Sequence, residues 1–273
     1  MATRIGVLGA DGRMGRAIVR AIAAREDKSA QLAAAVERPG SAAVGQDAGV
    51  IAGIGGTGVI IQQGFPEPKA APVDVWIDFT VPAATLAAAQ AAASRGVAMV
   101  IGTTGLSAAQ KAELAAAAKK IPIVLAANTS VGVTVLLKLC ADAARALGPG
   151  FDLEIVETHH RAKRDAPSGT ALRLAEALAE ATGRDLGATA RYQRHGDIGP
   201  RTDAEIGIQT LRGGDVVGDH TIYFLGQGER VEITHRATSR DTFAHGAVRA
   251  ALWVSGRPPG LYDMRDVLGF ATS

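Results

Sequence analysis

The chain has 273 residues, of which 47% are hydrophobic and 21% charged, so it is long enough for one large or two ordinary domains with a sizeable core. Lys and Arg number 29 and Asp and Glu number 27, and the resulting net charge of +2 argues against electrostatic capture of nucleic acid or of an anionic membrane surface. The single cysteine, Cys140, excludes an internal disulfide, and the sequence shows neither a signal-peptide pattern nor an apolar run of about 18 residues, so we expect a cytoplasmic protein without a membrane span.

Strands and helices alternate in the first half of the chain. A strand begins almost at once, and the Gly- and Pro-rich segment 37–72 interrupts the alternation, with one short apolar piece at 59–61. Because this alternation is typical of βαβ units, it predicts a parallel sheet in a Rossmann-type dinucleotide-binding domain of about residues 1–128. In chain order we expect strands over 4–8, 31–36, 73–79, 97–101 and 121–126, and helices over 14–24, 82–95 and 107–119.

The pattern changes after residue 128. A long apolar helix, in which Cys140 is expected to be an inert core thiol, is followed by a mostly β region whose strands are joined by Gly-rich turns. The expected elements are helices over 131–147, 171–182 and 242–253, strands over 151–158, 206–211, 221–225 and 230–237, and a short mixed tail over 261–268. We therefore predict an α+β domain over 129–238 with an open mixed sheet, and a segment 239–273 that packs back on the first domain. A symmetric oligomer would bury the uncovered face of that sheet.

A glycine-rich loop follows the first expected strand and opens the first helix. It reads Gly9-Ala10-Asp11-Gly12-Arg13-Met14-Gly15, with the second glycine one position later than in G-x-G-x-x-G. Glycines allow a tight turn and close approach of the backbone to a pyrophosphate, and the helix start offers free N–H groups. The loop predicts a cofactor site, with a tight turn that binds nothing as the alternative.

Charged and small residues at later strand ends support the cofactor interpretation. Glu37 and Arg38 end the second strand, where an acidic residue can bond the ribose hydroxyls of NAD and an arginine can pair with the 2′-phosphate of NADP. Both cofactors, NADH and NADPH, are therefore expected to be usable. The segments 78–80 and 102–105 end strands at the same carboxyl edge, where a parallel sheet binds its ligand.

The segment from Glu154 to Thr170, EIVETHHRAKRDAPSGT, carries the strongest chemical signal. It runs from an expected strand through a basic loop to a helix start, so that side chains and backbone N–H groups can converge on an anion. An imidazole beside an ammonium group suits proton transfer on a dicarboxylate. The alternative for the pair His159-His160 is one buried, hydrogen-bonded histidine and one exposed one.

Several motifs together resemble the dihydrodipicolinate reductase family, also called 4-hydroxy-tetrahydrodipicolinate reductase. They are GADGRMG at 9–15, DFT at 78–80, GTTG at 102–105, ANTSVG at 127–132, ETHHRAKRDAPSGTAL at 157–172 and LRGGDVVGDH at 211–220. The resemblance covers essentially the whole chain. It implies a Rossmann-type domain, an α+β domain whose sheet mediates a homotetramer, and NAD(P)H-dependent reduction in the diaminopimelate route to lysine.

The resemblance also implies roles for individual residues. His159 is similar to the family's acid/base residue and Lys163 to its proton-donating partner. The matching substrate-binding positions are His160, Lys163, Ser168, Gly169 and Thr170. The matching cofactor-binding positions are Gly9, Ala10, Asp11, Gly12, Arg13, Met14, Glu37, Arg38, Phe79, Gly102, Thr103, Thr104, Ala126 and Asn128. Asp11 and Arg164 depart from the family's common residues.

These roles fit the chemistry of a cyclic imine that carries two carboxylates. Hydride addition to its conjugated ring leaves an enamine, which a histidine can protonate because its pKa lies near neutrality. The alternative is another two-domain NAD(P)-dependent dehydrogenase that acts on an amino-acid-like substrate. A nucleotide-sensing regulator would need a basic DNA-binding module, and no segment of this sequence offers one. No metal is expected, because cations adjoin the histidines. The remaining histidines, His195, His220, His235 and His245, are expected to be isolated and structural, and the loop 194–201 either closes over substrate or is simply solvated.

Overall fold

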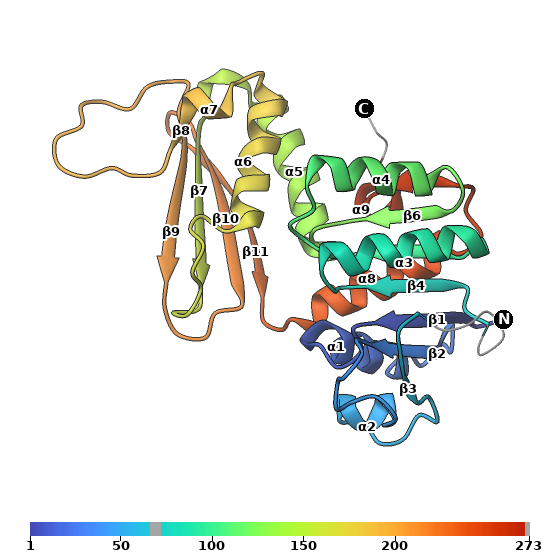
Figure 1. Cartoon of the computed structure of the whole chain (residues 1–273). Coiled ribbons are helices and arrows are strands. Elements are labelled where there is room, and N and C mark those ends of the chain that lie inside the picture. Colours follow the sequence, from blue (N-terminus) through green and yellow to red (C-terminus); the bar gives the residue numbers. More distant parts are fainter. Residues whose placement is uncertain (66–71, 271–273) are drawn as a thin grey trace. The chain divides into compact units, whose positions relative to one another are not determined.

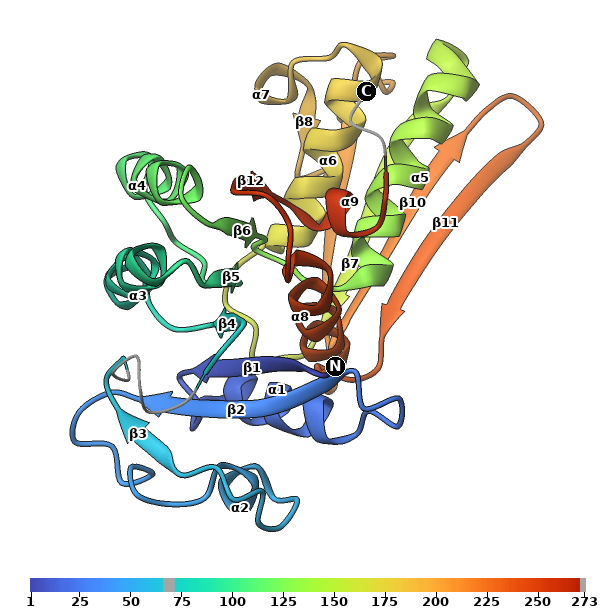
Figure 2. The same ribbon diagram turned by 90° about the vertical axis from the view of Figure 1, so that its right-hand side faces the viewer.

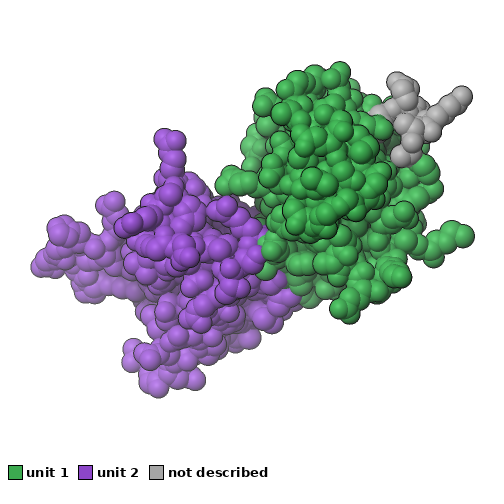
Figure 3. All heavy atoms as spheres, turned by 90° about the horizontal axis from the view of Figure 1, so that it is seen from below, with its two compact units in different colours: residues 1–131, 241–273 green, residues 132–240 purple. Residues whose placement is uncertain are grey.

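The computed structural model describes residues 1–65 and 72–270, and its strands form two separate sheets (Figure 1). The chain divides into two units. The N-terminal unit comprises residues 1–131 and the segment from Asp241 onward, and the C-terminal unit comprises residues 132–240 (Figure 3). The sequence placed its boundaries at 128/129 and 238/239. No helix in the described ranges is both long and apolar enough to cross a membrane.

The N-terminal unit is built around a seven-stranded sheet in which every pairing is parallel. Its strand order is β12-β6-β5-β4-β1-β2-β3. The strands are β1 (Thr3–Leu8), β2 (Ala30–Glu37), β3 (Ile61–Gln63), β4 (Val75–Asp78), β5 (Ala98–Ile101), β6 (Pro122–Leu125) and β12 (Gly260–Tyr262). The helices are α1 (Arg13–Ala23), α2 (Ala48–Ala52), α3 (Pro82–Arg95), α4 (Ala108–Ala118), α8 (Asp241–Val254) and α9 (Met264–Val267).

The order of the strands reverses beside β1. The chain runs outward from β1 to β2 and β3, then returns to place β4 on the other side of β1. Open parallel sheets bind ligands at such a switch point, outside the carboxyl ends of the strands. The loops that follow Leu8 and Asp78 therefore lie at the position where a ligand is expected.

Helices cover both faces of this sheet, which explains why its strands are apolar runs rather than alternating ones. One core joins the sheet to α1 and α8, and the other joins it to α3 and α4. Figure 2 shows α3 and α4 on one side of β4 to β6 and α8 on the other. Alternation along a single strand serves both cores: Val75 and Ile77 belong to the first, and Trp76 belongs to the second.

Some details of the N-terminal unit differ from the sequence prediction. The Gly- and Pro-rich segment contains the five-residue helix α2, whose N-cap Asp47 accepts hydrogen bonds from Gly49 N and Val50 N. Part of that segment, residues 66–71, lies outside the described residues. The expected mixed tail supplies a seventh strand, β12, which pairs with β6. Both elements are too short to show a periodic apolar pattern.

The C-terminal unit has a five-stranded mixed sheet with the order β11-β10-β7-β9-β8. The pairs β10/β11 and β10/β7 are antiparallel, whereas β7/β9 and β8/β9 are parallel. The strands are β7 (Asp152–His159), β8 (Ala190–Arg191), β9 (Ile206–Arg212), β10 (Gly218–Leu225) and β11 (Arg230–Ala237). The helices are α5 (Val131–Leu147), α6 (Gly169–Thr182), α7 (Leu186–Thr189) and the 3-10 turn η1 (Gly148–Gly150).

Only one face of this second sheet is covered by helices within the unit. Helices α5 and α6 lie on this face (Figure 1). They form a core with Ile155, Ile208 and Phe224. Along β7 and β10 buried residues alternate with half-buried ones, the pattern of a sheet with one covered face. The predicted fold class, a parallel Rossmann-like sheet followed by a mixed sheet, is confirmed.

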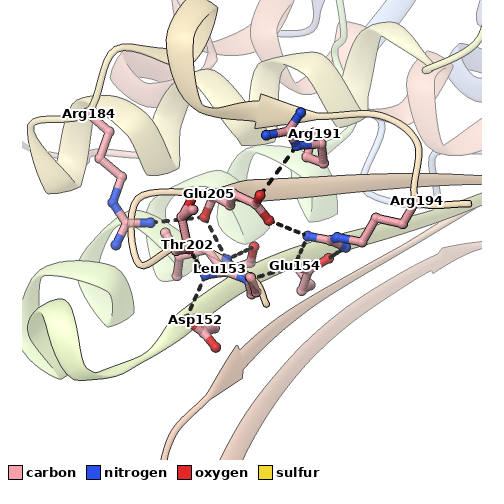
Figure 4. A network of polar contacts seen from close by, with 9 residues as sticks. Asp152, Leu153, Glu154, Arg184, Arg191, Arg194, Thr202 and Glu205 are labelled. Atoms are coloured by element: carbon pink, nitrogen blue, oxygen red, sulfur yellow. Dashed lines mark hydrogen bonds and ion pairs between the residues drawn. The ribbon is translucent and has the colours of Figure 1, made fainter. Parts of the chain in front are cut away.

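The loop between β8 and β9 is fastened to the open face of the sheet by ion pairs. Arg194 binds Glu154 with both terminal nitrogens, at 2.8 and 2.7 Å (Figure 4). Arg201 Nη1 binds Asp152 Oδ1 at 2.7 Å. Glu154 fits because Gly207 beside it has no side chain: a Cβ there would lie 1.8 Å from Glu154 Oε2. The sheet therefore holds the loop at Arg194 and Arg201, whereas residues 195–200 between them are exposed.

Candidate active site

The glycine loop joins β1 to α1 in a turn that only small residues allow. Gly9 has a φ of +72°, and a Cβ on Gly15 would lie 2.1 Å from Gly9 O. Helix α1 begins after Gly12, which caps it without a side chain, and its first turn holds no acidic residue. No acidic side chain of the helix therefore compensates the positive end of its dipole. An anion bound at the helix start can take that place.

Asp11, the acidic residue of this loop, is paired with an arginine of helix α1. Its carboxylate lies 2.5 Å from Arg16 Nη2, and its carbonyl accepts a bond from Arg16 Nε at 2.9 Å. Both side chains are partly exposed. The negative charge that departs from the family's pattern is thus compensated by a neighbour on α1.

A pocket of about 670 Å³ opens beside this loop at the carboxyl ends of β1 and β2. The residues expected at a cofactor site that line it are Gly9, Asp11, Gly12, Glu37, Arg38 and Phe79. The Glu37 carboxylate is fixed there, since it accepts bonds from Asp11 N at 3.1 Å and Arg38 N at 3.0 Å. The structure therefore brings the glycine loop and the Glu37-Arg38 pair to one pocket.

A second pocket of about 340 Å³ lies at the carboxyl ends of β4, β5 and β6. Met14, Phe79, Gly102, Thr103, Thr104 and Asn128 line it as expected, together with Thr80, Ala127, Thr129 and Phe243. Gly102 is required for its shape, because a Cβ there would lie 2.1 Å from Phe79 Cε1. The expected cofactor residues Ala10, Arg13 and Ala126 line neither of these two pockets.

A buried carboxylate holds the wall of the second pocket in place. Asp78 Oδ1 accepts bonds from Thr80 N at 3.1 Å and Thr80 Oγ1 at 2.6 Å, and Thr103 Oγ1 lies 3.4 Å from Asp78 Oδ2. Burial raises the pKa of Asp78, while the bonds from the threonines oppose that rise. The sequence placed this residue at a strand end but did not indicate its role in fixing the loop.

His159 ends β7 and is 8% exposed. Its Nδ1 lies 2.5 Å from Oε2 of Glu157, a carboxylate with no exposed surface. Burial lowers the pKa of His159 and Glu157 opposes that shift. The neighbouring His160 is only half-buried, so the pair consists of one enclosed, hydrogen-bonded imidazole and one more accessible one.

The basic loop after β7 places an ammonium group near the histidines in sequence and ties it to a carboxylate. Lys163 Nζ lies 2.8 Å from Asp165 Oδ2, with 20% of the lysine side chain exposed. The Lys163 ammonium lowers the pKa of Asp165. Arg164, which departs from the family's pattern, is exposed.

The Ser-Gly-Thr turn forms the start of α6. Ser168 is its N-cap: the hydroxyl accepts a bond from Ala171 N at 3.1 Å, and the backbone N–H of Ser168 donates to Glu157 Oε1 at 3.0 Å. Gly169 begins the helix, and Thr170 follows it. First-turn N–H groups of a helix lack carbonyl partners within it, so this turn suits a carboxylate ligand.

Sequence reasoning missed three residues around His159, which are Glu157, Arg212 and His220. Arg212 binds the Glu157 carboxylate at 2.8 and 2.9 Å, and His220 Nε2 lies 3.1 Å from Ser168 Oγ. His220 also packs edge-on against the His159 ring at 5.2 Å, so the expectation that it is isolated is wrong. Strand alternation places Glu157 and His159 on one face of the sheet, so the sequence could have indicated Glu157. Arg212 and His220 come close to His159 only through the pairing of strands that are distant in the sequence.

Two kinds of site are not supported by the side chains of the described residues. Cys140 is buried in α5, and burial raises the pKa of its thiol to about 12, which does not suit a catalytic nucleophile. Within 1–65 and 72–270, no three His, Cys, Asp or Glu side chains gather in a way that could hold a metal ion.

Two family models match the chain, one to each part of it. The model for the N-terminus of dihydrodipicolinate reductase matches residues 3–129, and the model for the C-terminus matches residues 132–268. The chain belongs to the dihydrodipicolinate reductase family. The resemblance stated on the motifs is thereby confirmed, and members of this family use NADH or NADPH.

Full-length relatives and solved structures agree with this assignment. The 4-hydroxy-tetrahydrodipicolinate reductase of Anaeromyxobacter dehalogenans is 55% identical, with 98% of each chain covered. That of Pseudomonas fluorescens is 57% identical, covering 97% of this chain and 98% of the relative. Dipicolinate-bound dihydrodipicolinate reductase from Paenisporosarcina sp. TG-14 shares the fold with a TM-score of 0.76 at 24% identity, covering 96% of this chain and 98% of that one.

Proposed function

We propose that this chain reduces 4-hydroxy-tetrahydrodipicolinate to tetrahydrodipicolinate with NADH or NADPH, a step of lysine and diaminopimelate biosynthesis, and that His159 completes the reduction by protonation. Membership of the family supports this activity and speaks against the alternative of another two-domain NAD(P)-dependent dehydrogenase of an amino-acid-like substrate. The single observation that supports the role of His159 is its hydrogen bond to the buried Glu157 carboxylate.

The N-terminal unit is the cofactor-binding domain in this proposal. Its residues fit a nicotinamide dinucleotide, since α1 starts without a side-chain cap and pockets of about 670 and 340 Å³ lie at the carboxyl edge. The backbone from Gly9 to Met14 would bind the pyrophosphate, and Glu37 and Arg38 the adenosine end. Phe79, Gly102, Thr103, Thr104 and Asn128, which line the smaller pocket, would surround the nicotinamide. When bound, the cofactor supplies the hydride.

The C-terminal unit is the substrate-binding domain. His160, Lys163 and the turn of Ser168, Gly169 and Thr170 would bind the carboxylates of the ring, because cationic side chains and helix-start N–H groups favour anions. With the ring held in this way, hydride addition leaves an enamine, and one of its carbons must then be protonated. His159 donates that proton, and Lys163 assists as a second proton donor.

The open face of the second sheet supports a proposal about assembly. Leu211 is 53% exposed on β9, and Val156 and Tyr223 on neighbouring strands are only half-buried. Leaving apolar side chains of a sheet in water is costly, and a symmetric contact between copies would cover them. The C-terminal unit would thus also be the tetramerisation domain of a homotetramer. Measuring the mass of the protein in solution tests this proposal. We place the enzyme in the cytoplasm, where Cys140 stays reduced.

The proposed activity is tested by following the absorbance of NADH and of NADPH during turnover. The substrate is the freshly generated product of the preceding synthase, added to the full-length chain. We expect both cofactors to be oxidised only when that substrate is present. If neither NADH nor NADPH is oxidised although both bind to the protein, the proposal is overturned.

A further inference from the structure

The segment 212–220, which links β9 to β10, surrounds His159 although the proposed mechanism gives it no role. It belongs to the motif LRGGDVVGDH at 211–220. Strand β7 lies between β9 and β10 in the sheet, so both ends of this segment adjoin the end of β7. Arg212 pairs with His159 in the register of β7 and β9.

Glu157 is the centre of the contacts that this segment makes. Its carboxylate is fully buried and accepts bonds from His159 Nδ1 at 2.5 Å, Arg212 at 2.8 and 2.9 Å and Ser168 N at 3.0 Å. Thr210 Oγ1 donates a further, longer bond at 3.2 Å. A buried carboxylate is tolerated when it is paired and its lone pairs are satisfied, and the two-pronged bond from Arg212 meets both conditions.

The ionised state of Glu157 decides which nitrogen of His159 carries the proton. Burial raises the pKa of Glu157, but the bonds from Arg212, His159 and Ser168 outweigh it and lower the pKa to about 2. An ionised carboxylate can only accept hydrogen bonds, so Nδ1 of His159 must be protonated. Nε2 is then the nitrogen that gains and loses the catalytic proton. Gly218 lies beside it, since a Cβ there would be 3.0 Å from Nε2.

Backbone hydrogen bonds from the same segment hold the loop that follows His159. Gly213 N donates to His159 O at 3.0 Å, and His160 N donates to Val216 O at 2.7 Å. Arg212 Nη2 also donates to Asp165 O at 2.7 Å, so one guanidinium ties the carboxylate and the basic loop together. His220 adds a contact at the other end of the segment, with Nε2 3.1 Å from Ser168 Oγ.

From these contacts we infer that Glu157, held ionised by Arg212, is a positioning residue that fixes the tautomer and orientation of His159. The inference rests on the proposed role of His159 as the proton donor. Glu157 acts as the carboxylate of a hydrolase triad does, by holding an imidazole in one tautomer and stabilising its charged form. Neither Glu157 nor Arg212 needs to touch substrate.

The test compares Glu157→Gln with Thr210→Val in the full-length chain. Thr210→Val removes a bond to the same carboxylate and leaves the one to His159 in place, so it serves as the matched control. We expect Glu157→Gln to lower kcat by at least about 10²-fold, because a neutral amide no longer enforces the tautomer. The Kd for NADH is expected to stay unchanged in both variants. The control should keep kcat within about threefold of the wild type, as expected for the loss of one weak hydrogen bond.

Two further readouts separate positioning from a merely structural role. The kcat of a protonated acid falls as pH rises through its pKa, and loss of Glu157 lowers the pKa of His159, so this fall should move to lower pH in Glu157→Gln. Nuclear magnetic resonance of isotope-labelled histidine, assigned with His159→Asn, should show the Nδ1-protonated tautomer in the wild type and a mixture in the variant. If Glu157→Gln does not fold, the double variant Glu157→Gln, Arg212→Met removes the unpaired cation as well and is expected to show the same changes.

Wild-type kcat in Glu157→Gln would overturn the inference, and so would a reduced kcat with the tautomer and the pH dependence of His159 unchanged. Wild-type kcat in His159→Asn would instead overturn the proposed role of His159 as the proton donor, so the two failures are distinguishable.

Discussion

At the scale of single residues, we propose that Glu37 and Arg38 divide the recognition of the two cofactors between them. The Glu37 carboxylate is fixed by Asp11 N and Arg38 N, whereas the Arg38 side chain is exposed at the rim of the larger pocket. A fixed carboxylate suits the ribose hydroxyls of NADH, and an exposed guanidinium suits the additional phosphate of NADPH.

Arg38→Ala is therefore expected to weaken NADPH selectively. Loss of a charge-assisted hydrogen bond of about 1.5–3 kcal/mol corresponds to a rise of about 10- to 100-fold in the Kd for NADPH. The Kd for NADH should stay close to that of the wild type. Titration calorimetry with each cofactor measures both values, and an equal loss for the two would contradict the assignment of Arg38 to the 2′-phosphate.

Single residues also show where the sequence was sufficient for the site and where it was not. The histidine pair and the Ser-Gly-Thr turn stand in one short segment, so their proximity follows from the sequence alone. Glu157 is only two residues from His159, and alternation places both on one face. Arg212 and His220 reach that face through strand pairing across more than fifty positions, as the register of β7 with β9 and β10 shows, and local patterns carry no such information.

At the scale of elements, the long helices and strands were predicted most reliably. The predicted helices over 82–95 and 131–147 have the bounds of α3 and α5. For α3 the reason is local: Pro82 stands at its first turn, and Gly96 ends it with a φ of +69°. The short elements α2, α7, β8 and β12 were missed, because two to five residues cannot display a period.

The junction of β1 and α1 yields a prediction about close packing. In Gly15→Ala the new Cβ would lie 2.1 Å from Gly9 O and 2.7 Å from Ala10 Cα, both backbone atoms that cannot give way. We expect a loss of about 1–3 kcal/mol in the free energy of unfolding, measured with denaturant in the absence of cofactor. Gly12→Ala is the matched control, because the nearest atom to its new Cβ would be Gly9 O at 3.1 Å. Equal losses in the two variants would show that the contact at Gly15 is not what limits this turn.

At the scale of the whole molecule, the buried histidine His220 couples stability to pH. It is 3% exposed, and burial, with the nearby His159 adding to it, lowers its pKa to about 4. Because the folded-state pKa lies below the unfolded value, the neutral ring stabilises the fold fully above about pH 6.5 and this stabilisation is lost as pH falls toward 4. His159 shifts in the same direction.

The wild type should lose on the order of 3 kcal/mol of unfolding free energy between pH 7 and 4 through His220. Denaturant unfolding at a fixed protein concentration measures it. His220→Asn should show a clearly smaller loss, whereas His195→Gln, a change at an exposed histidine, should keep the wild-type slope. A wild-type slope in His220→Asn would mean that other groups set the acid sensitivity.

The central proposal for the whole molecule is that His159 donates the proton that completes the reduction. The direct measurement is the steady-state kcat of His159→Asn with freshly generated substrate, together with the Kd of NADH and NADPH for the same variant. We predict a fall in kcat of about 10²–10⁴-fold with both cofactor affinities unchanged, because general acid catalysis acts on the transition state. An unchanged kcat, or a loss confined to cofactor binding, would contradict the account.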